Sequence, residues 1–320
     1  MPKAAKLAKN PDAPELTLED WGLLIGLAAL WGGVFFLSEI VLVAFPPLSQ
    51  VAIRVSIAAA ALWLALLARG MAPPRGLGVW GALLLLGLVN SAAPFSLIVY
   101  GQTHIEAGLA SILNATTPVF AVIVAGLLLS DEKITASRMA GVLIGLAGAA
   151  LVIGPSALLD IRGSSTIGQL SVLGAALCYG FGAVGVRRLA ATRLPLLSIA
   201  AGQLTAAALI VAPAALLIDR PFGAEAMARY AATPSGELLW IWAALIVQGV
   251  ACTALAILMY FRIIASAGAG NGALVTFLIP PFAILLGALF LSERLELEDY
   301  LGMLVIGFGL ALLDGRLLRR

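Results

Sequence analysis

Apolar stretches long enough to cross a bilayer as helices follow one another along nearly the whole chain, with only short connections between them. The chain of 320 residues is 62% hydrophobic and 11% charged, which is more apolar surface than a soluble domain can bury. The pattern therefore predicts an all-α integral membrane protein that has almost nothing outside the lipid bilayer.

We predict ten transmembrane helices in this sequence. Pro46 and Pro47 close a tight turn between the first two, because an X-Pro pair cannot continue a helix. The longest connection, 219–236, is expected to hold a short surface helix. The expected spans are 20–43, 48–69, 77–100, 107–130, 136–154, 167–188, 195–218, 237–262, 270–292 and 297–314.

The distribution of lysine and arginine predicts the orientation, because short cytoplasmic loops carry an excess of both. With the N-terminus inside, fourteen of the 19 Lys and Arg residues fall inside, four fall outside, and Arg54 lies within a span. The basic N-terminal segment lacks a signal-peptide h-region, so the first helix is expected to be an uncleaved anchor. Both termini, 1–19 and 315–320, are therefore expected to be cytoplasmic tails at a bacterial-type inner (plasma) membrane.

The two halves of the sequence repeat each other. "NATTPVFAVIVAGLLLSDEKITASRMAGVLIGLAGAALV" (114–152) matches "TFLIPPFAILLGALFLSERLELEDYLGMLVIGFGLALLD" (276–314), and "LWGGVFF" (30–36) matches "CYGFGAV" (178–184) more weakly. Five spans per copy is an odd number, so the copies, 20–154 and 167–314, would enter the membrane from opposite sides. Chance similarity of apolar segments is the alternative. The matched pairs are Pro118 and Pro280, Phe120 and Phe282, Glu132 and Glu293, Gly141 and Gly302, and Gly148 and Gly309.

With "ALWGGVFF" in the first span, these two motifs resemble the EamA type of the drug/metabolite transporter superfamily, over nearly the whole chain. The resemblance implies ten spans in two inverted halves, a central cavity and export of small metabolites. Within the superfamily, the chain is most similar to the YddG-type exporters of aromatic and other neutral amino acids.

Residues that would support catalysis or metal binding are scarce. His104 is the single histidine, and Cys178 and Cys252 lie in apolar runs that are typical of buried cysteines. The sequence has no metalloprotease, serine hydrolase or nucleotide-binding motif. We therefore expect no enzyme activity, no cofactor, no metal and no nucleic-acid partner. The glycine stripes at 141–150 and 302–309 are expected to pack helices, within the chain or in a homodimer.

Glu39 and Arg54 are charged residues well inside predicted spans, where charge is costly. Both lie about 10–12 Å along their helices from the turn at Pro46, which places them at similar depth. The sequence predicts either an ion pair that joins the first two spans or a site for an amino-acid carboxylate or amine.

Polar groups recur near the middle of four spans, where they either repair proline kinks or line a water-accessible cavity. Deep aromatic residues either complete an apolar pocket or fill the core. The cavity candidates are Trp31, Phe35, Asn90, Pro94, Phe95, Asn114, Thr117, Tyr179, Gln203, Gln248, Thr253, Thr276 and Phe277, and the expected hinges are Pro94, Pro118 and Pro280.

These features predict a secondary transporter that works by alternating access at a cavity near the midplane, and the resemblance implies that it exports a small molecule, an amino acid in the first instance. A proton-coupled exporter of drugs or cationic compounds is the alternative. A lipid-processing membrane enzyme would need clustered acids or histidines at one face, and a channel would need a ring of charge or carbonyl groups; the sequence has neither.

Overall fold

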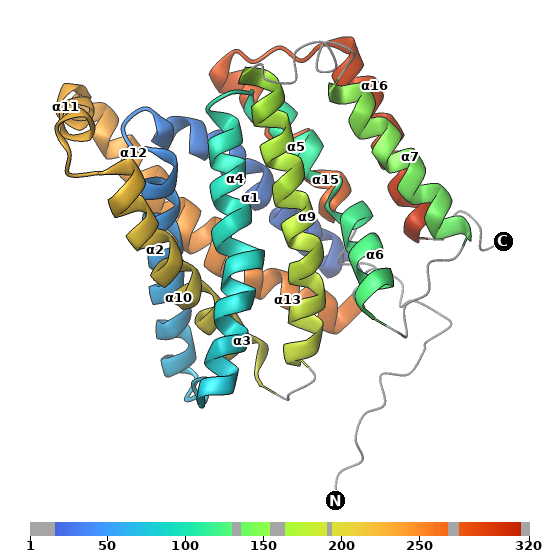
Figure 1. Ribbon diagram of the computed structural model, residues 1–320, viewed down its shortest axis with the longest axis horizontal. Helices are drawn as coiled ribbons and strands as arrows, with labels where there is room; N and C mark the ends of the chain where they lie inside the picture. The colour runs from blue at the N-terminus through green and yellow to red at the C-terminus, as the bar shows by residue number, and fades with distance from the viewer. Residues whose placement is uncertain (1–16, 130–135, 154–163, 191–193, 268–274, 315–320) are drawn as a thin grey trace, which may run out of the picture.

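The structure is a computed structural model that describes residues 17–129, 136–153, 164–190, 194–267 and 275–314. All regular structure in these ranges is helical (Figure 1). The α-helices are α1 (Leu18–Leu42), α2 (Pro47–Ala68), α3 (Leu77–Gly87), α4 (Ala93–Gln102), α5 (Ala107–Asn114), α6 (Thr117–Leu128), α7 (Ala136–Ile153), α9 (Ser164–Ala190), α10 (Leu196–Ala214), α11 (Ala224–Ala232), α12 (Ser235–Gly249), α13 (Ala256–Ala267), α15 (Val275–Leu286) and α16 (Leu297–Asp314). The π-helical segments are η1 (Leu88–Ala92), η2 (Ala215–Asp219), η3 (Val250–Leu255) and η4 (Gly287–Leu291).

Seven segments of the described chain are long and apolar enough to cross a membrane. Leucines such as Leu64, Leu127 and Leu209 are exposed on these helices, as expected of surfaces that face lipid. The prediction of an all-α membrane protein is therefore confirmed, whereas the count of ten spans and the side of the termini stay predictions. The seven segments are Leu18–Leu42, Pro47–Ala68, Leu77–Gln102, Ala107–Leu128, Ser165–Leu189, Leu196–Asp219 and Ser235–Tyr260, and two shorter apolar helices are Met139–Val152 and Leu278–Leu291.

Prolines and polar caps set the ends of the helices. α1 begins after Thr17, which forms a capping box with Asp20, and α2 begins at Pro47, one residue before the predicted start of the second span. Asp219 caps α2 from a distant part of the chain, since its Oδ2 accepts hydrogen bonds from the Ser49 amide (2.6 Å) and hydroxyl (2.9 Å). The connection after Asp219 holds the predicted surface helix, α11, which has no buried residue.

Two of the long segments change helical geometry near their centres. Between α3 and α4 lies η1, and between α12 and α13 lies η3; each follows a buried glycine, Gly87 and Gly249 respectively. A π-helical turn leaves extra backbone carbonyls available for side chains, and such turns occur often at functional sites. The break between α5 and α6 differs, because there the helix ends at Asn114 and restarts at Thr117.

Glycines sit where pairs of helices approach most closely. A Cβ atom on Gly32 of α1 would lie 2.8 Å from Phe282 Cβ on α15, and one on Gly180 of α9 would lie 3.0 Å from the Phe120 carbonyl on α6. The repeat aligns Gly32 with Gly180 and Phe120 with Phe282, so the two contacts are equivalent in the two halves of the chain. At these contacts α1 packs against α15, and α6 packs against α9. Each pair joins a helix of the first half of the chain to a helix of the second half.

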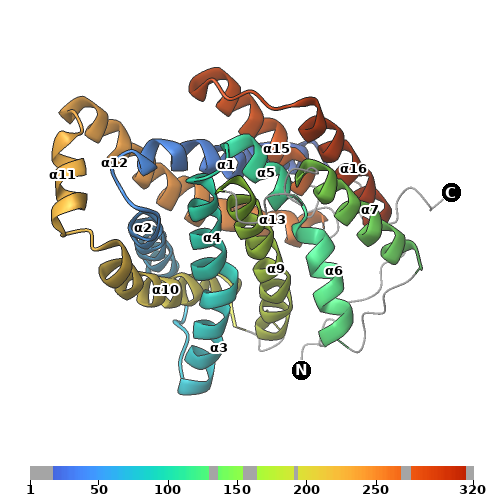
Figure 2. The ribbon, with the colours of Figure 1, turned by 45° about the horizontal axis from the view of Figure 1, so that its top comes forward.

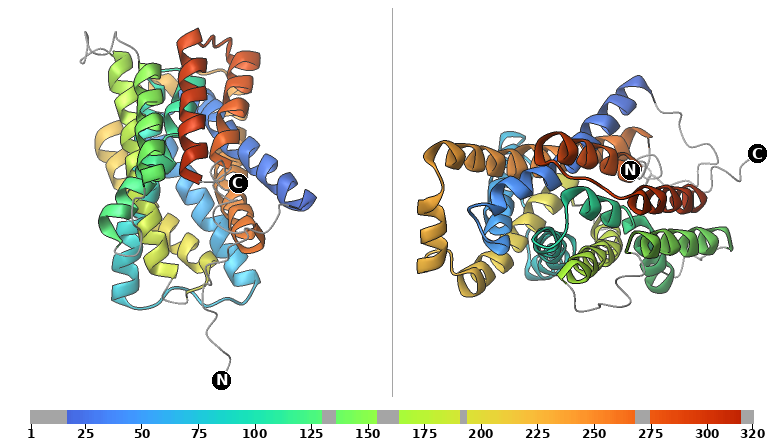
Figure 3. Two further views of the ribbon diagram at one scale, coloured as in Figure 1. Left: turned by 90° about the vertical axis from the view of Figure 1, so that its right-hand side faces the viewer. Right: turned by 90° about the horizontal axis from the view of Figure 1, so that it is seen from above.

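The same relation appears in the pair formed by α7 and α16, which pack side by side at one edge of the bundle (Figures 2 and 3). A Cβ on Gly148 would lie 3.0 Å from the Gly302 carbonyl oxygen, and a Cβ on Gly309 would lie 2.8 Å from the Gly141 carbonyl oxygen. The glycine stripes therefore serve helix packing within the chain.

Candidate functional site

A buried guanidinium lies at the centre of the bundle. Arg54 of α2 is 5% exposed; its Nε donates a hydrogen bond to Thr253 Oγ1 of η3 at 3.0 Å, and its Cζ lies 4.3 Å from the centre of the Phe95 ring on α4. Tyr179 of α9 lies 6.5 Å from Phe95, ring centre to ring centre, and both Tyr179 and Cys252 lie near Arg54. Within the described residues, Arg54 has no carboxylate partner.

A hydrogen-bonded network continues from Arg54 toward α1. The Thr253 hydroxyl donates to the Gln248 carbonyl at 2.7 Å, a bond that the π-helical geometry of η3 permits. The Gln248 side chain donates to Ser38 Oγ at 3.1 Å and accepts from Gln50 Nε2 at 3.4 Å. Buried side chains from α1, α2, α12 and η3 are thereby connected, and the network positions Thr253 beneath the guanidinium.

A matching arrangement without charge exists in the other half of the chain. Gln203 of α10 donates from Nε2 to Ser91 Oγ of η1 at 2.8 Å. A Cβ on Gly87 would meet the Gln203 carbonyl oxygen at 2.7 Å, just as one on Gly249 would meet the Arg54 carbonyl oxygen at 3.1 Å. Gln203 thus occupies the place of Arg54 and supplies a hydrogen bond without a charge.

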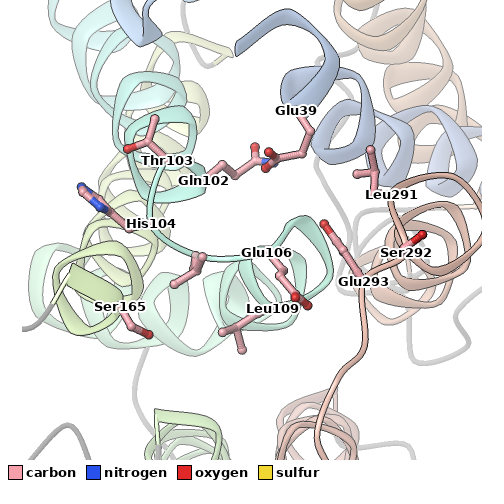
Figure 4. Close-up of a pocket in the computed structure, with 11 residues that line it drawn as sticks. Glu39, Gln102, Thr103, His104, Glu106, Leu109, Ser165, Leu291, Ser292 and Glu293 are labelled. Carbon is pink, nitrogen blue, oxygen red and sulfur yellow. The ribbon is translucent and has the colours of Figure 1, made fainter. Parts of the chain in front are cut away.

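A second polar region is a cavity of about 650 Å³ at the end of the bundle where α4 connects to α5 (Figures 1 and 4). Glu39 of α1 points toward Gln102 of α4 at one side of this cavity (Figure 4). The Gln102 Nε2 donates to Glu39 Oε1 and to the Phe35 carbonyl oxygen, both at 2.8 Å. The cavity is lined by Glu39, Gln102, Thr103, His104, Ile105, Glu106, Leu109, Ser165, Leu291, Ser292 and Glu293.

The predicted ion pair between Glu39 and Arg54 does not form, and this prediction is wrong. Glu39 accepts its hydrogen bond from Gln102, whereas Arg54 contacts Thr253 and Phe95. The reason is that α2 packs mainly against α10 rather than against α1, its neighbour in the sequence. Similar depth on adjacent segments therefore does not bring the two charges together.

Comparison with known proteins decides the family. The model of the EamA-like transporter family matches residues 21–154 and 166–313. The chain belongs to the EamA-like transporter family. It is 23% identical over 289 residues to the uncharacterized transporter YoaV of Bacillus subtilis, covering 90% of this chain and 94% of that protein. To the uncharacterized transporter YvbV of the same species it is 29% identical over 294 residues, covering 91% and 90%.

Two further comparisons are with a solved structure and with a relative that matches one segment of the chain. A solved crystal structure matches with a TM-score of 0.63 and 21% identity, covering 94% of this chain and 97% of that one, which shows the fold alone. A probable terminal-alkyne amino-acid exporter of Streptantibioticus cattleyicolor is 33% identical over 99 residues, 31% of this chain and 33% of that protein. This EamA-like chain is thus a multi-pass membrane transporter of small molecules and not an enzyme.

The structure brings some of the predicted cavity residues of this EamA-like transporter together and separates others. Phe95, Tyr179, Gln248 and Thr253 join Arg54, and Gln203 forms the matching arrangement. The others lie elsewhere. Trp31 packs against Tyr260, and Phe35 and Pro94 are buried. Asn90 lies close to Gly182, and Thr276 lines a small pocket of about 40 Å³ together with Pro280. The Phe277 side chain lies outside the described residues.

The polar residues near Pro118 repair the break between α5 and α6. Thr117 Oγ1 donates to the Asn114 carbonyl and Thr116 Oγ1 donates to the Leu113 carbonyl, both at 2.7 Å. These bonds satisfy backbone groups that the break releases. Local repair therefore accounts for the Thr117 hydroxyl, while the roles of Pro94, Pro118 and Pro280 as hinges stay predictions.

Several residues of both polar regions were not predicted from the sequence. Gln50 and Ser38 complete the network at Gln248, and Gln102 and Glu106 line the cavity. Glutamines near the ends of apolar spans were the feature of the sequence that indicated them. Only the packing of the helices shows which partners these glutamines contact. The aligned Glu293 was the other signal, because a carboxylate repeated at a connection indicates a structural or functional role.

Glu293 caps α5 from the connection between η4 and α16. Its Oε1 accepts from the Ala107 amide at 2.8 Å and its Oε2 accepts from the Gly108 amide at 3.0 Å. A carboxylate at a helix N-terminus satisfies free amides and interacts favourably with the helix dipole. The cap joins the second half of the chain to the first across the cavity rim.

We predict that Glu293→Gln lowers the free energy of unfolding by about 1 kcal/mol, within the usual range for a lost cap, because one acceptor oxygen and the charge are removed. The measurement is the denaturation midpoint of the purified protein in detergent. Glu296→Gln, at an exposed position just before α16, removes a charge without removing an amide acceptor of α5, and it should lower the midpoint less. Equal stability of the two variants would contradict a capping role.

Proposed function

We propose that this EamA-like transporter exports amino acids, aromatic and other neutral ones, and that Arg54 binds the substrate carboxylate. The observation that carries the proposal is a buried guanidinium, at the centre of a membrane bundle, that has no carboxylate partner in the described chain. A charge in this position costs several kcal/mol unless an opposite charge or hydrogen bonds compensate it. An anion that enters the bundle would supply the compensation.

The geometry around Arg54 favours a carboxylate. A guanidinium has five N–H donors in a planar fork, and the bond to Thr253 uses only the one on Nε. The two terminal nitrogens form the edge that binds a carboxylate in a bidentate manner. The face of the Phe95 ring lies against the guanidinium, and the bond from Nε to Thr253 directs it further, so both contacts favour one orientation before the substrate arrives.

Aromatic rings beside Arg54 favour an apolar or aromatic side chain on the substrate. Phe95 and Tyr179 lie close to each other and to the guanidinium, and they come from different helices, α4 and α9. Rings at this separation leave edges and faces for offset stacking with a third ring. The name of the Streptantibioticus cattleyicolor relative, which mentions an amino-acid exporter, points to the same class of substrate.

Alternating access through two inverted repeats is the mechanism that we propose. It is supported by the family model, which matches the chain twice, and by the paired glycine contacts of α1 with α15 and of α6 with α9. It is also supported by the correspondence of Arg54, Gly249 and Thr253 with Gln203, Gly87 and Ser91. Two similar halves whose helices pack against each other can exchange conformations. The centre of the bundle then opens first to one side of the membrane and next to the other.

We propose that the end of the bundle with the α4–α5 connection faces outward at the plasma membrane, with both termini inside. Arginines at the opposite end support this orientation: Arg69 and Arg75 lie near the α2–α3 connection, and Arg187 and Arg188 lie in the last turn of α9. The bacterial transporters among the relatives support a plasma-membrane location. A homodimer contact at α7 and α16 is tested by the oligomeric state of the purified protein.

Counterflow in liposomes tests the proposed function. Purified protein is reconstituted with unlabelled phenylalanine inside, and uptake of labelled phenylalanine, tryptophan, threonine, methionine or a cationic drug is followed. We expect saturable counterflow of the neutral amino acids, with the aromatic ones preferred. Absence of saturable amino-acid flux would overturn the proposal, and drug accumulation driven by a pH gradient would support the proton-coupled alternative instead.

A further inference from the structure

The cavity at the α4–α5 end is strongly acidic. Glu39 of α1, Glu106 of the α4–α5 connection and Glu293 of the η4–α16 connection all line it, and no lysine or arginine is among its lining residues. The two oxygens of Glu293 are used by the backbone amides of α5, whereas Glu106 is exposed and Glu39 is half-buried. Two carboxylates are therefore accessible to a ligand within the cavity.

A buried acceptor beside these carboxylates lacks a donor. Gln102 is 4% exposed, and its Nε2 is directed at two acceptors, Glu39 Oε1 and the Phe35 carbonyl oxygen. These two partners determine the orientation of the amide, so Oε1 must be the other atom, and it has no hydrogen-bond partner in the described chain. An unpaired buried acceptor is costly. A cationic donor that approached Glu39 would release the Gln102 amide and offer a partner to both groups.

Electrostatics at Glu106 agree with excess negative charge. Burial raises the pKa of Glu106, and Glu293 and Asp299 of α16 raise it further, while a backbone hydrogen bond from Arg294 partly opposes the shift. The other groups that face the cavity are Glu39 from α1 and His104 from the α4–α5 connection. The carboxylates repel one another and would be stabilised by a cation.

The size and spacing of the site select the kind of cation. Among the described residues, no three His, Cys, Asp or Glu side chains come close enough to hold one metal ion, so a bare divalent cation is a poor fit. The cavity of about 650 Å³ lies within the range of small-molecule sites. An ammonium group has three donors, which suit separated acceptors such as the Glu39 and Glu106 carboxylates and the Gln102 oxygen.

We propose that this cavity binds the ammonium group of an organic amine and thereby makes the transporter selective for substrates that carry a free amino group. The inference deepens the proposed function, on which it rests for its role in transport: Arg54 takes the carboxylate at the centre, and the acidic cavity takes the ammonium on the way out. Binding of an amine at this cavity is, however, a separate property that can be measured without transport.

Equilibrium binding of two phenylalanine analogues tests the site. Phenethylamine carries the ammonium without the carboxylate, and 3-phenylpropionate carries the carboxylate without the ammonium. We expect the double variant Glu39→Gln, Glu106→Gln to bind phenethylamine at least about fivefold more weakly than the unmodified protein, and salt to weaken binding likewise. Binding of 3-phenylpropionate should not weaken. Glu225→Gln, an exposed position on α11, is the control that should bind both compounds normally.

The outcomes separate this site from the proposed function. Phenethylamine binding that is absent from the unmodified protein, or unchanged in the double variant, would overturn the ammonium site. A further outcome is that phenethylamine binding is lost in the double variant and kept in the control, while the unmodified protein shows no amino-acid counterflow. This result would support the ammonium site and overturn amino-acid export. The single variant Glu106→Gln keeps the test decisive if Glu39→Gln impairs folding, because Glu106 is exposed, and it too should weaken phenethylamine binding.

Discussion

Replacement of Arg54 by glutamine should abolish amino-acid export while the bundle stays folded. Gln203 occupies the equivalent position in the other half of the chain. It donates a hydrogen bond to a π-helical segment, as Arg54 does, and it carries no charge. A glutamine at 54 can therefore donate to Thr253 as Arg54 does. Glutamine cannot supply the positive charge and the paired N–H donors with which a guanidinium binds a substrate carboxylate.

The expected loss in kcat/KM for phenylalanine counterflow is about 100-fold, equivalent to about 2.8 kcal/mol and within the range for removal of one partner from a buried charge pair. Arg54→Lys should lose less, about tenfold, because it keeps the charge but loses the paired N–H donors of the guanidinium that lies over Phe95. Both values come from initial rates in liposomes at several substrate concentrations. Binding of 3-phenylpropionate should fall in parallel with transport.

The folding readout is the denaturation midpoint in detergent. Arg54→Gln should match or exceed the unmodified protein, because a buried uncompensated charge is replaced by a neutral hydrogen-bonding group. Gln203→Leu is the reciprocal control: it leaves the Ser91 hydroxyl without its partner and should lower stability more than it lowers substrate affinity. Normal transport by Arg54→Gln would refute carboxylate binding at this residue.

Adding a single methyl group at Gly32 should destabilise the bundle, whereas the same change at the next residue should not. A Cβ on Gly32 would lie 2.8 Å from the Ile279 carbonyl oxygen and 3.1 Å from the Ala283 amide nitrogen on α15. Backbone atoms cannot move aside as a flexible side chain can, so α1 and α15 would have to separate. At Gly33 the nearest atom, Leu286 Cδ1, is 3.9 Å away, which is ordinary contact.

We expect Gly32→Ala to lower the free energy of unfolding by about 1–3 kcal/mol, the usual cost of overpacking. Gly33→Ala should be neutral or stabilising, because alanine favours the helix by about 1 kcal/mol over glycine. Denaturation midpoints of both variants, measured side by side in one detergent, provide the comparison. If the two midpoints fall by the same amount, the close approach of α1 and α15 at Gly32 is not what constrains this position.

Much of the helical framework could be predicted from local sequence. Pro46 and Pro47 mark the turn that the structure places between α1 and α2, and Pro118 marks the break between α5 and α6. Such features depend on backbone chemistry within a few residues, because proline lacks an amide proton and restricts its neighbours. The alignment of the two halves also identified Gly148 and Gly302, which meet at the α7–α16 contact.

The candidate sites were less predictable. Distance along a helix gave comparable depths for Glu39 and Arg54, but depth does not tell which way a side chain faces. The rotation of each helix follows from its packing partners, and α2 packs against α10 while Glu39 meets Gln102 of α4. The two charges therefore belong to separate regions, one at the centre and one in the end cavity.

Composition and periodicity alone were sufficient for the class of protein, since the bilayer requires apolar helices whatever their arrangement. Proline positions were sufficient for the turn and the break, whereas the glycine stripes indicated close packing without showing which helices form the pairs. The partners of Arg54, the acidic cavity and the cap on α5 required the tertiary structure. Each depends on side chains that are distant in sequence, such as Glu293 and Ala107, and their meeting is determined by the summed packing of many helices rather than by any local signal.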